Sequence, residues 1–185
     1  MTEIINSESI STPQAMINIS LSRQISAPRE KVWEAISKPG NLSYCHPFCE
    51  KNSVEKWPGI GSEDTVYFYS GKVATRYFTK WIEGVGYDLN LTIQSINVQV
   101  NVIFRISSIE ESYESLLNIS IIINILPTTL ESSRSGYLHF IRRSLENYLD
   151  SVLKGYEYYI TTGQAVKRNQ FGSHPIFSPA IDIID

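Results

Sequence analysis

Two cysteines and a histidine lie within the short segment Cys45-His46-Pro47-Phe48-Cys49. Thiolate and imidazole groups bind zinc well, but a structural zinc site usually takes four such ligands, often as two separated pairs. The remaining histidines, His139 and His174, lie far along the chain without a supporting spacing, and the chain has no other cysteine. The pattern therefore favours two small thiols packed in a corner of the fold over a metal site or a disulfide.

A single arginine inside the strand-like run Val73 to Glu83 is the second candidate for chemistry. Strict alternation places Arg76 and Lys80 on one side of that strand and Tyr77 on the other. A buried arginine would need a carboxylate or a ligand anion to offset its lost hydration, and Asp64 falls in a predicted turn, where a solvated carboxylate is expected. Alternation therefore favours an Arg76 that faces solvent, and an Arg76 that faces a cavity is the alternative.

Aromatic side chains are the third candidate, because they make up 11% of the chain and many of them fall between Tyr44 and Trp81. A tyrosine ring packs against an apolar ligand while its hydroxyl orients a polar group, although core packing is an alternative role for each ring. The residues that we expect to line a cavity are Tyr44, His46, Phe48, Tyr67, Tyr69, Arg76, Tyr77, Tyr87 and Phe104.

Several function classes are disfavoured by missing signals. The chain has no phosphate-binding glycine loop, no Gly-x-Ser-x-Gly elbow, no paired metal-binding histidines on a helix and no nucleotide fingerprint, so we predict no cofactor and no metal. A net charge of -3 without a basic run disfavours nucleic acid. No apolar run approaches the ~20 residues of a membrane helix. A polar amino terminus and only two cysteines predict a cytoplasmic protein.

The elements that must position these residues follow from periodicity. Alternating apolar residues predict a first strand over Ile17 to Ile25, and Ser26 and Pro28 provide a cap and a first-turn proline for a short helix. A second helical or irregular segment over Asn41 to Phe48 resembles a lid or a corner. Further strands are expected over Asn52 to Trp57, Thr65 to Ser70, Val73 to Glu83, Tyr87 to Ile93, Val98 to Ser107 and Ser115 to Ile125.

A long amphipathic helix over Tyr137 to Ile160 ends this series of strands. Its apolar residues recur at three-four spacing and form one stripe, which needs the apolar face of the sheet as its partner. We therefore predict an α+β helix-grip fold: a curved antiparallel sheet of about seven strands wrapped around a long C-terminal helix, with two short helices after the first strand. Residues 1–15 are expected to be a flexible lead-in, 16–163 the domain and 164–185 a tail.

This order of elements resembles the START-like superfamily, also called SRPBCC, which includes polyketide cyclases and lipid-transport domains. The most specific match is the strand-to-helix junction from Ile25 to Ile36, followed by Pro47 and the Pro58-Gly59-Ile60-Gly61-Ser62 turn. The resemblance implies an elongated apolar pocket between the sheet and the terminal helix. It also aligns Arg76 with an arginine that polyketide aromatase/cyclases direct into their cavity, but Ala74 stands where those enzymes have a serine.

The leading hypothesis is binding or transport of a hydrophobic small molecule, such as a lipid, a sterol or a polyketide-like compound, without catalysis. The alternative is a polyketide cyclase or dehydratase in which Arg76, His46 or a pocket tyrosine polarises a carbonyl. A protein-interaction domain is a further alternative, and an exposed apolar patch would favour it. The oligomeric state stays open, and so does the tail, whose Phe171 and Phe177 pack either on the domain or against a neighbouring subunit.

Overall fold

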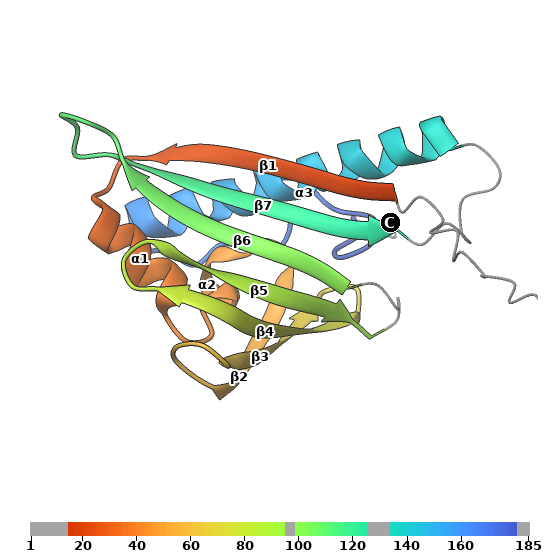
Figure 1. The fold of residues 1–185 in the computed structure, drawn as a ribbon, viewed down its shortest axis with the longest axis horizontal. Coiled ribbons are helices and arrows are strands. Elements are labelled where there is room, and N and C mark those ends of the chain that lie inside the picture. Colours follow the sequence, from red (N-terminus) through yellow and green to blue (C-terminus); the bar gives the residue numbers. More distant parts are fainter. Residues whose placement is uncertain (1–14, 95–98, 126–133, 181–185) are drawn as a thin grey trace, which may run out of the picture.

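Seven strands form one antiparallel sheet in the computed structural model, which describes residues 15–94, 99–125 and 134–180 (Figure 1). The strands are β1 (Ala15–Ile25), β2 (Cys49–Lys56), β3 (Glu63–Phe68), β4 (Val73–Ile82), β5 (Gly86–Ile93), β6 (Gln99–Ser108) and β7 (Ser115–Ile125). Their spatial order is β1-β7-β6-β5-β4-β3-β2. The first strand of the chain, β1, is therefore an edge strand beside the last one, β7, and β2 forms the other edge. Residues 1–14 of the predicted lead-in, Val98 and the last residues of the tail, 181–185, lie outside the described residues.

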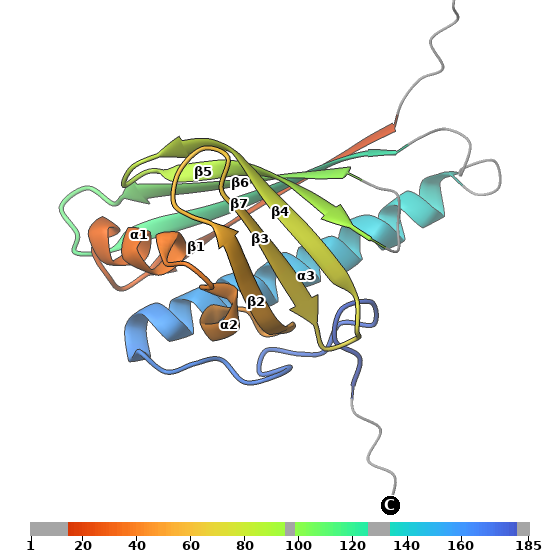
Figure 2. The ribbon, with the colours of Figure 1, turned by 90° about the horizontal axis from the view of Figure 1, so that it is seen from below.

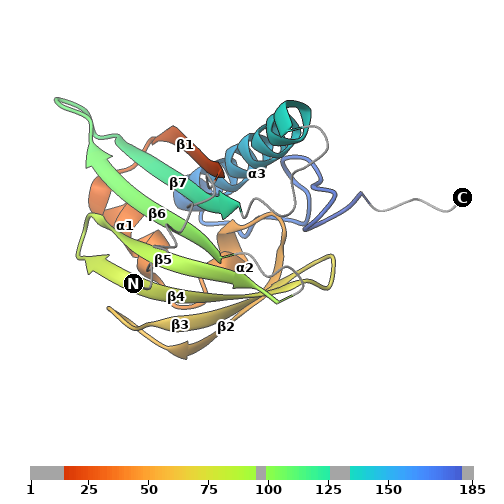
Figure 3. The same cartoon turned by 45° about the vertical axis from the view of Figure 1, so that its right-hand side comes forward.

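Three helices lie on one face of this sheet, α1 (Arg29–Ser37), α2 (Leu42–Cys45) and α3 (Arg134–Thr162). The sheet curves over α3, as Figures 2 and 3 show from two further directions. The predicted helix-grip α+β fold is therefore confirmed. The prediction that Ser26 caps the first helix is wrong. Pro28 occupies the N-cap position, and the Ser26 hydroxyl donates a hydrogen bond to Glu114 Oε1 (2.9 Å).

The two faces of the sheet differ in polarity, which decides where the helices pack. On the inner face, Ile17 and Ile19 of β1 pair with Ile123 and Ile121 of β7, and three of these four side chains are buried. On the outer face, Ser20 pairs with Ser120, and their hydroxyls are hydrogen-bonded to each other (2.8 Å). Burying only the apolar face satisfies both sets of side chains.

Helix α3 buries one stripe along its C-terminal half, where Leu149, Val152, Tyr156 and Ile160 are all part of the core. A side chain at Gly155 would not fit there, because a Cβ atom would lie 2.1 Å from the Cys45 carbonyl oxygen. The glycine thus allows α2 to pack directly on α3. The N-terminal half of the stripe, including Leu138, Ile141 and Leu145, is only half-buried.

The chain after α3 turns back and packs on the helices and the sheet of the same chain, which is one of the two placements that the sequence left open. Gly163 ends the helix with a positive φ of +72°, and the tail then forms backbone hydrogen bonds with α2 and with the β3–β4 connection. The Val166 amide donates to the Tyr44 carbonyl (2.8 Å), and the Ser70 amide donates to the Phe177 carbonyl (3.1 Å). In Figure 2 the blue tail runs back beneath α2. No helix in the described part of the chain is long and apolar enough to cross a membrane.

Candidate functional site

A cavity of about 410 Å³ lies between the inner face of the sheet and α3. It follows α3 from Phe140 to Tyr156, a distance of about 24 Å at 1.5 Å per residue. Most of its lining is aliphatic and includes Leu89, Leu91, Val100, Val102, Ile119, Ile121, Leu145, Leu149 and Val152. In the half-buried part of the α3 stripe, Ile141 and Leu145 therefore face this cavity rather than close-packed core.

The mouth of the cavity lies beside the N-terminal half of α3 and the tail. Phe140 is 66% exposed and Ile176 is 41% exposed, and they are the only exposed side chains among the described residues that line the cavity. The tail therefore contributes to the cavity wall. Lining residues that carry a polar group are His46, Arg76, Ser144, Tyr148, Tyr156 and His174.

The nine residues proposed from the sequence separate into three groups. His46, Arg76 and Phe104 line the cavity. Phe48 and Tyr87 are buried in the core without being among the lining residues. The other four, Tyr44, Tyr67, Tyr69 and Tyr77, do not line it either: Tyr44, Tyr67 and Tyr77 are exposed, and Tyr69 is half-buried with the Arg168 guanidinium over its ring at 4.9 Å.

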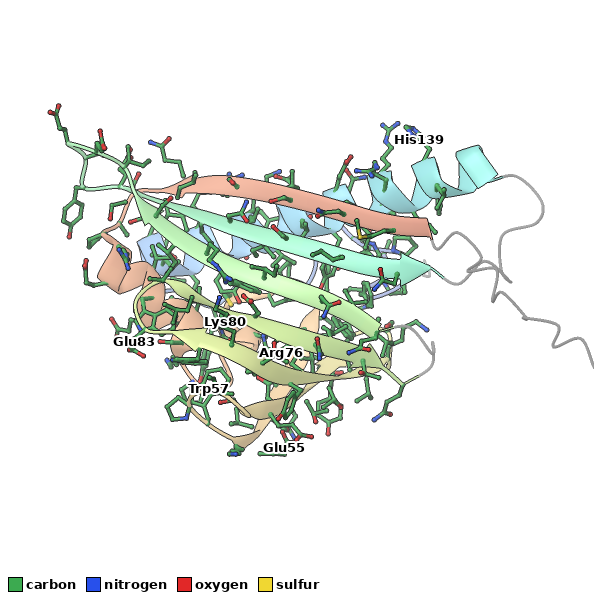
Figure 4. The ribbon with its side chains drawn as sticks, viewed as in Figure 1. Glu55, Trp57, Arg76, Lys80, Glu83 and His139 are labelled. Atoms are coloured by element: carbon green, nitrogen blue, oxygen red, sulfur yellow. The ribbon has the colours of Figure 1, made fainter. Side chains whose placement is uncertain are left out.

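The interpretation that Arg76 faces solvent is wrong, since this residue is only 3% exposed. A bulge in β4 between Phe78 and Lys80 interrupts the alternation, so Arg76 shares the inner face with Ala74 and Phe78, whereas Lys80 is exposed. Figure 4 labels Arg76 and Lys80 on the ribbon. Alternation counted from Lys80 therefore assigned Arg76 to the wrong face.

The carboxylate that compensates Arg76 is Asp64, which lies in β3 and not in a turn as expected. Asp64 is directly opposite Arg76 in the β3–β4 register and is fully buried. Arg76 Nε donates to Asp64 Oδ1 at 2.7 Å, and Nη2 donates to Oδ2, which makes the pair bidentate. Burial alone would lower the pKa of Arg76, but the Asp64 carboxylate outweighs burial and raises that pKa above its ordinary value.

Two buried amides complete what we call the deep cluster, which consists of Asn41, Asn52, Asp64 and Arg76. Arg76 Nη2 also lies within hydrogen-bonding distance of Asn41 Oδ1 (3.4 Å) and Asn52 Oδ1 (3.5 Å). The Asn41 amide group donates to the Ile36 carbonyl (2.8 Å) and to Tyr156 Oη (3.4 Å). The cluster therefore lies at the end of the cavity opposite Phe140, and its hydrogen bonds are largely made within the protein.

The cysteines of the 45–49 segment are both buried free thiols. Burial raises the pKa of Cys45 and that of Cys49 to about 12, so both are protonated at neutral pH. Among the described residues, no group of three or more histidine, cysteine or acidic side chains could hold a metal ion.

Two imidazole–hydroxyl pairs lie along the cavity wall nearer to the mouth. His46 Nε2 is 2.9 Å from Tyr148 Oη, and His174 Nε2 is 3.2 Å from Ser144 Oγ. Burial and then the positive charge of Arg76 lower the pKa of His46 to about 3, and burial also lowers the pKa of His174. Burial raises the pKa of Tyr148. These side chains are therefore uncharged at neutral pH.

No family model and no curated protein matches this chain. Several solved structures do. Norcoclaurine synthase from Thalictrum flavum, solved with a transition-state analogue, is 12% identical, with a TM-score of 0.62 and coverage of 82% of this chain and 98% of that one. Ara h 8.0201 is also 12% identical, with a TM-score of 0.61 and coverage of 80% and 99%. DynU16, from the dynemicin biosynthetic locus, is 12% identical at a TM-score of 0.57, and the match spans 85% of this chain but 52% of DynU16.

The chain has the helix-grip fold that these solved structures share. The predicted resemblance is thus confirmed at the level of the fold, because the arrangement of the elements agrees while the sequence identity is low. Among the residues that line the cavity, Tyr148, Ser144 and His174 were not predicted from the sequence. Tyr148 was assigned to the packing stripe of the terminal helix, and His174 to a tail outside the domain.

A signal for His174 was nevertheless present in the sequence. Two of the three histidines precede proline, in His46-Pro47-Phe48 and His174-Pro175-Ile176. In both, the backbone amide two residues after the histidine donates to its Nδ1 atom, at 3.2 Å from Phe48 and 3.3 Å from Ile176. The repeated His-Pro dipeptide therefore marks two segments with the same local hydrogen bond.

Proposed function

We propose that this protein binds a hydrophobic small molecule in the cavity between the sheet and α3. The observation that carries the proposal is the cavity itself, about 410 Å³ with a mainly aliphatic lining and a mouth at Phe140 and Ile176. Transfer of apolar surface from water into such a site is favourable by roughly 25 cal/mol per Å². A lipid, a sterol or a polyketide-like compound has the required apolar body.

The pKa values of the polar residues that line the cavity favour binding over acid–base catalysis. An efficient general acid or base has a pKa near the working pH. The pKa of His46 is about 3, the pKa of Tyr148 is raised, and Arg76 is held as a cation by Asp64. None of these three groups is suited to exchange a proton near neutral pH.

A cyclase or dehydratase acting on a polyketide-like substrate is the second candidate, because Arg76 and His46 both lie at the cavity wall. Such an enzyme would hold a folded chain near hydrogen-bond donors that polarise a carbonyl. Incubation with a poly-β-ketone thioester separates the candidates: loss of water from the probe, seen as a mass change, supports the enzyme, and recovery of the unchanged probe supports the carrier.

A protein-interaction role has less support. The most exposed apolar side chains of the described residues are Met16 on β1, Ile60 in the β2–β3 connection, Tyr113 in the β6–β7 connection and Phe140 on α3. They come from four separate elements, and Phe140 lies with Ile176 at the cavity mouth, where binding of a small molecule already accounts for their exposure.

The proposal is tested by filling the cavity. Val102 lines it from β6, whereas Val54 on β2 is exposed and outside it, so Val102→Phe and Val54→Phe are the same substitution at two sites. Each protein is incubated with a cellular lipid extract, repurified and extracted with solvent for mass spectrometry. We expect similar amounts of bound hydrophobic compounds in wild type and Val54→Phe. The amount in folded Val102→Phe should be at least several-fold lower. Equal amounts in all three would contradict the proposal.

A further inference from the structure

The two His-Pro segments hold their imidazoles in the same protonation pattern. His46 Nδ1 accepts the Phe48 amide hydrogen and His174 Nδ1 accepts the Ile176 amide hydrogen. A neutral imidazole carries a single proton, so an Nδ1 atom that accepts leaves that proton on Nε2. Proline between the partners has no amide hydrogen of its own, which leaves the next residue as the donor. Each Nε2 atom is therefore a hydrogen-bond donor.

The acceptors of these two Nε2 hydrogens are hydroxyl oxygens on α3. His46 Nε2 donates to Tyr148 Oη (2.9 Å), and His174 Nε2 donates to Ser144 Oγ (3.2 Å). Residues four apart on a helix lie on the same face, and both hydroxyl residues line the cavity. Aromatic packing fixes the arrangement further, because the Tyr148 ring contacts His46 and His174 at 5.6 and 5.5 Å between ring centroids.

Each hydroxyl thus receives a hydrogen bond and still has its own hydrogen to donate. No described residue accepts a hydrogen bond from Tyr148 Oη or from Ser144 Oγ. A donor without an acceptor in a mainly aliphatic cavity is costly, so these hydrogens favour an occupant that offers an acceptor.

We propose that the ligand carries an uncharged acceptor oxygen, such as a ketone or an ester carbonyl, held by the Tyr148 hydroxyl and assisted by that of Ser144. This inference rests on the proposed function and names the class of ligand that the cavity selects. His46 and His174 are positioning residues, since they act through the hydroxyls. A pure hydrocarbon would leave both hydroxyl hydrogens unpaired. A carboxylate would lose its hydration beside neutral imidazoles, with Arg76 already paired to Asp64.

The test compares two neutral probes that share the naphthalene body, 2-acetylnaphthalene, which has a ketone, and 2-ethylnaphthalene, which has no hydrogen-bond acceptor. Their dissociation constants are measured by displacement of the neutral dye N-phenyl-1-naphthylamine. Tyr148→Phe removes the hydroxyl and keeps the ring. Tyr158→Phe is the matched control on the same helix, because the Tyr158 hydroxyl is exposed and donates to Gln164 (2.8 Å).

We expect Tyr148→Phe to weaken binding of the ketone about fivefold to tenfold, the effect of one lost neutral hydrogen bond, and to leave the ethyl compound unchanged or bound more tightly. Tyr158→Phe should change neither. The carbonyl stretching frequency of the bound ketone should be lower in wild type than in Tyr148→Phe. Equal effects on both probes, or an unchanged carbonyl frequency, would overturn the inference while cavity binding stands. Failure of the dye and both probes to bind wild type would overturn the proposed function and this inference with it.

The positioning role has its own readout. Nitrogen-15 NMR of the imidazole rings should show the Nε2-protonated tautomer for both His46 and His174 at neutral pH. Nδ1-protonated rings would overturn the assigned direction of the hydrogen bonds and with it the donor role of the two hydroxyls.

Discussion

The deep cluster and the imidazole–hydroxyl pairs both place polar groups at the wall of an apolar cavity, but they differ in how far their hydrogen bonds are satisfied. Arg76 forms a bidentate pair with Asp64 and reaches two buried amides. Tyr148 and Ser144 each accept a hydrogen bond from an imidazole and have no acceptor among the described residues. The first set is largely complete without a ligand, and the second is not.

This difference indicates which polar group at a cavity wall supports the fold and which one selects a ligand. A buried ion pair whose two charges are hydrogen-bonded to each other contributes little to ligand recognition. Removing one partner leaves the other charge buried and unpaired, which lowers the stability of the fold. A hydroxyl that is held in place with an unpaired hydrogen discriminates between an occupant that offers an acceptor and one that does not. Burial and charge alone would have favoured Arg76 as the recognition residue.

Removal of the Asp64 charge should have the largest effect. Asp64→Asn keeps the shape of the side chain but leaves the buried Arg76 cation without a counter-charge, so the free energy of unfolding should fall by about 3–5 kcal/mol. Ser144→Ala is the contrasting variant from the imidazole–hydroxyl pairs, and because it leaves only the uncharged His174 Nε2–H group without its acceptor, its cost should be about 1–2 kcal/mol. Urea denaturation measures both. Similar losses for the two variants would remove the distinction between the regions.

Acidification should act on the imidazole–hydroxyl pairs with a smaller effect. The pKa of His46 falls from 6.5 to about 3 on folding, so between these values the unfolded chain binds more protons than the native one. The contribution of His46 to the free energy of unfolding is therefore fully present above pH 6.5. It is lost as the pH drops below 6.5, by up to about 1.4 kcal/mol per pH unit.

The measurement is urea denaturation at pH 6.5, 5.5 and 4.5 for wild type and His46→Gln. The variant lacks the titrating ring, so its stability should decline less steeply with falling pH than that of wild type. Parallel pH profiles would mean that His46 is not held neutral by its surroundings.

Most of the fold could be predicted from the sequence, because alternation and three-four spacing report directly which side of an element is buried. The expected strand over Val73 to Glu83 matches β4 (Val73–Ile82), and the expected terminal helix lies within α3. The errors arise where a local irregularity breaks the period. One extra residue between Phe78 and Lys80 was enough to reverse the side assigned to Arg76.

The candidate site could be predicted only in part, because its residues meet through tertiary contacts. His174 reaches Ser144 only after the tail has turned back, and nothing periodic marks that return. Asp64 became a partner of Arg76 through the β3–β4 register, which the turn assignment for Asp64 had hidden. Tyrosine content was a poor guide, since Tyr44, Tyr67 and Tyr77 lie on the surface.

The central claim, that the cavity between sheet and α3 binds a hydrophobic molecule, is tested most directly by NMR of the wild-type protein with labelled methyl groups and bound 2-acetylnaphthalene. We predict intermolecular nuclear Overhauser effects from the probe to the methyl groups of Val102 and Leu149, which line the cavity, and none to those of exposed Val54. Effects confined to Val54 and other surface methyl groups, or none at all, would contradict the account.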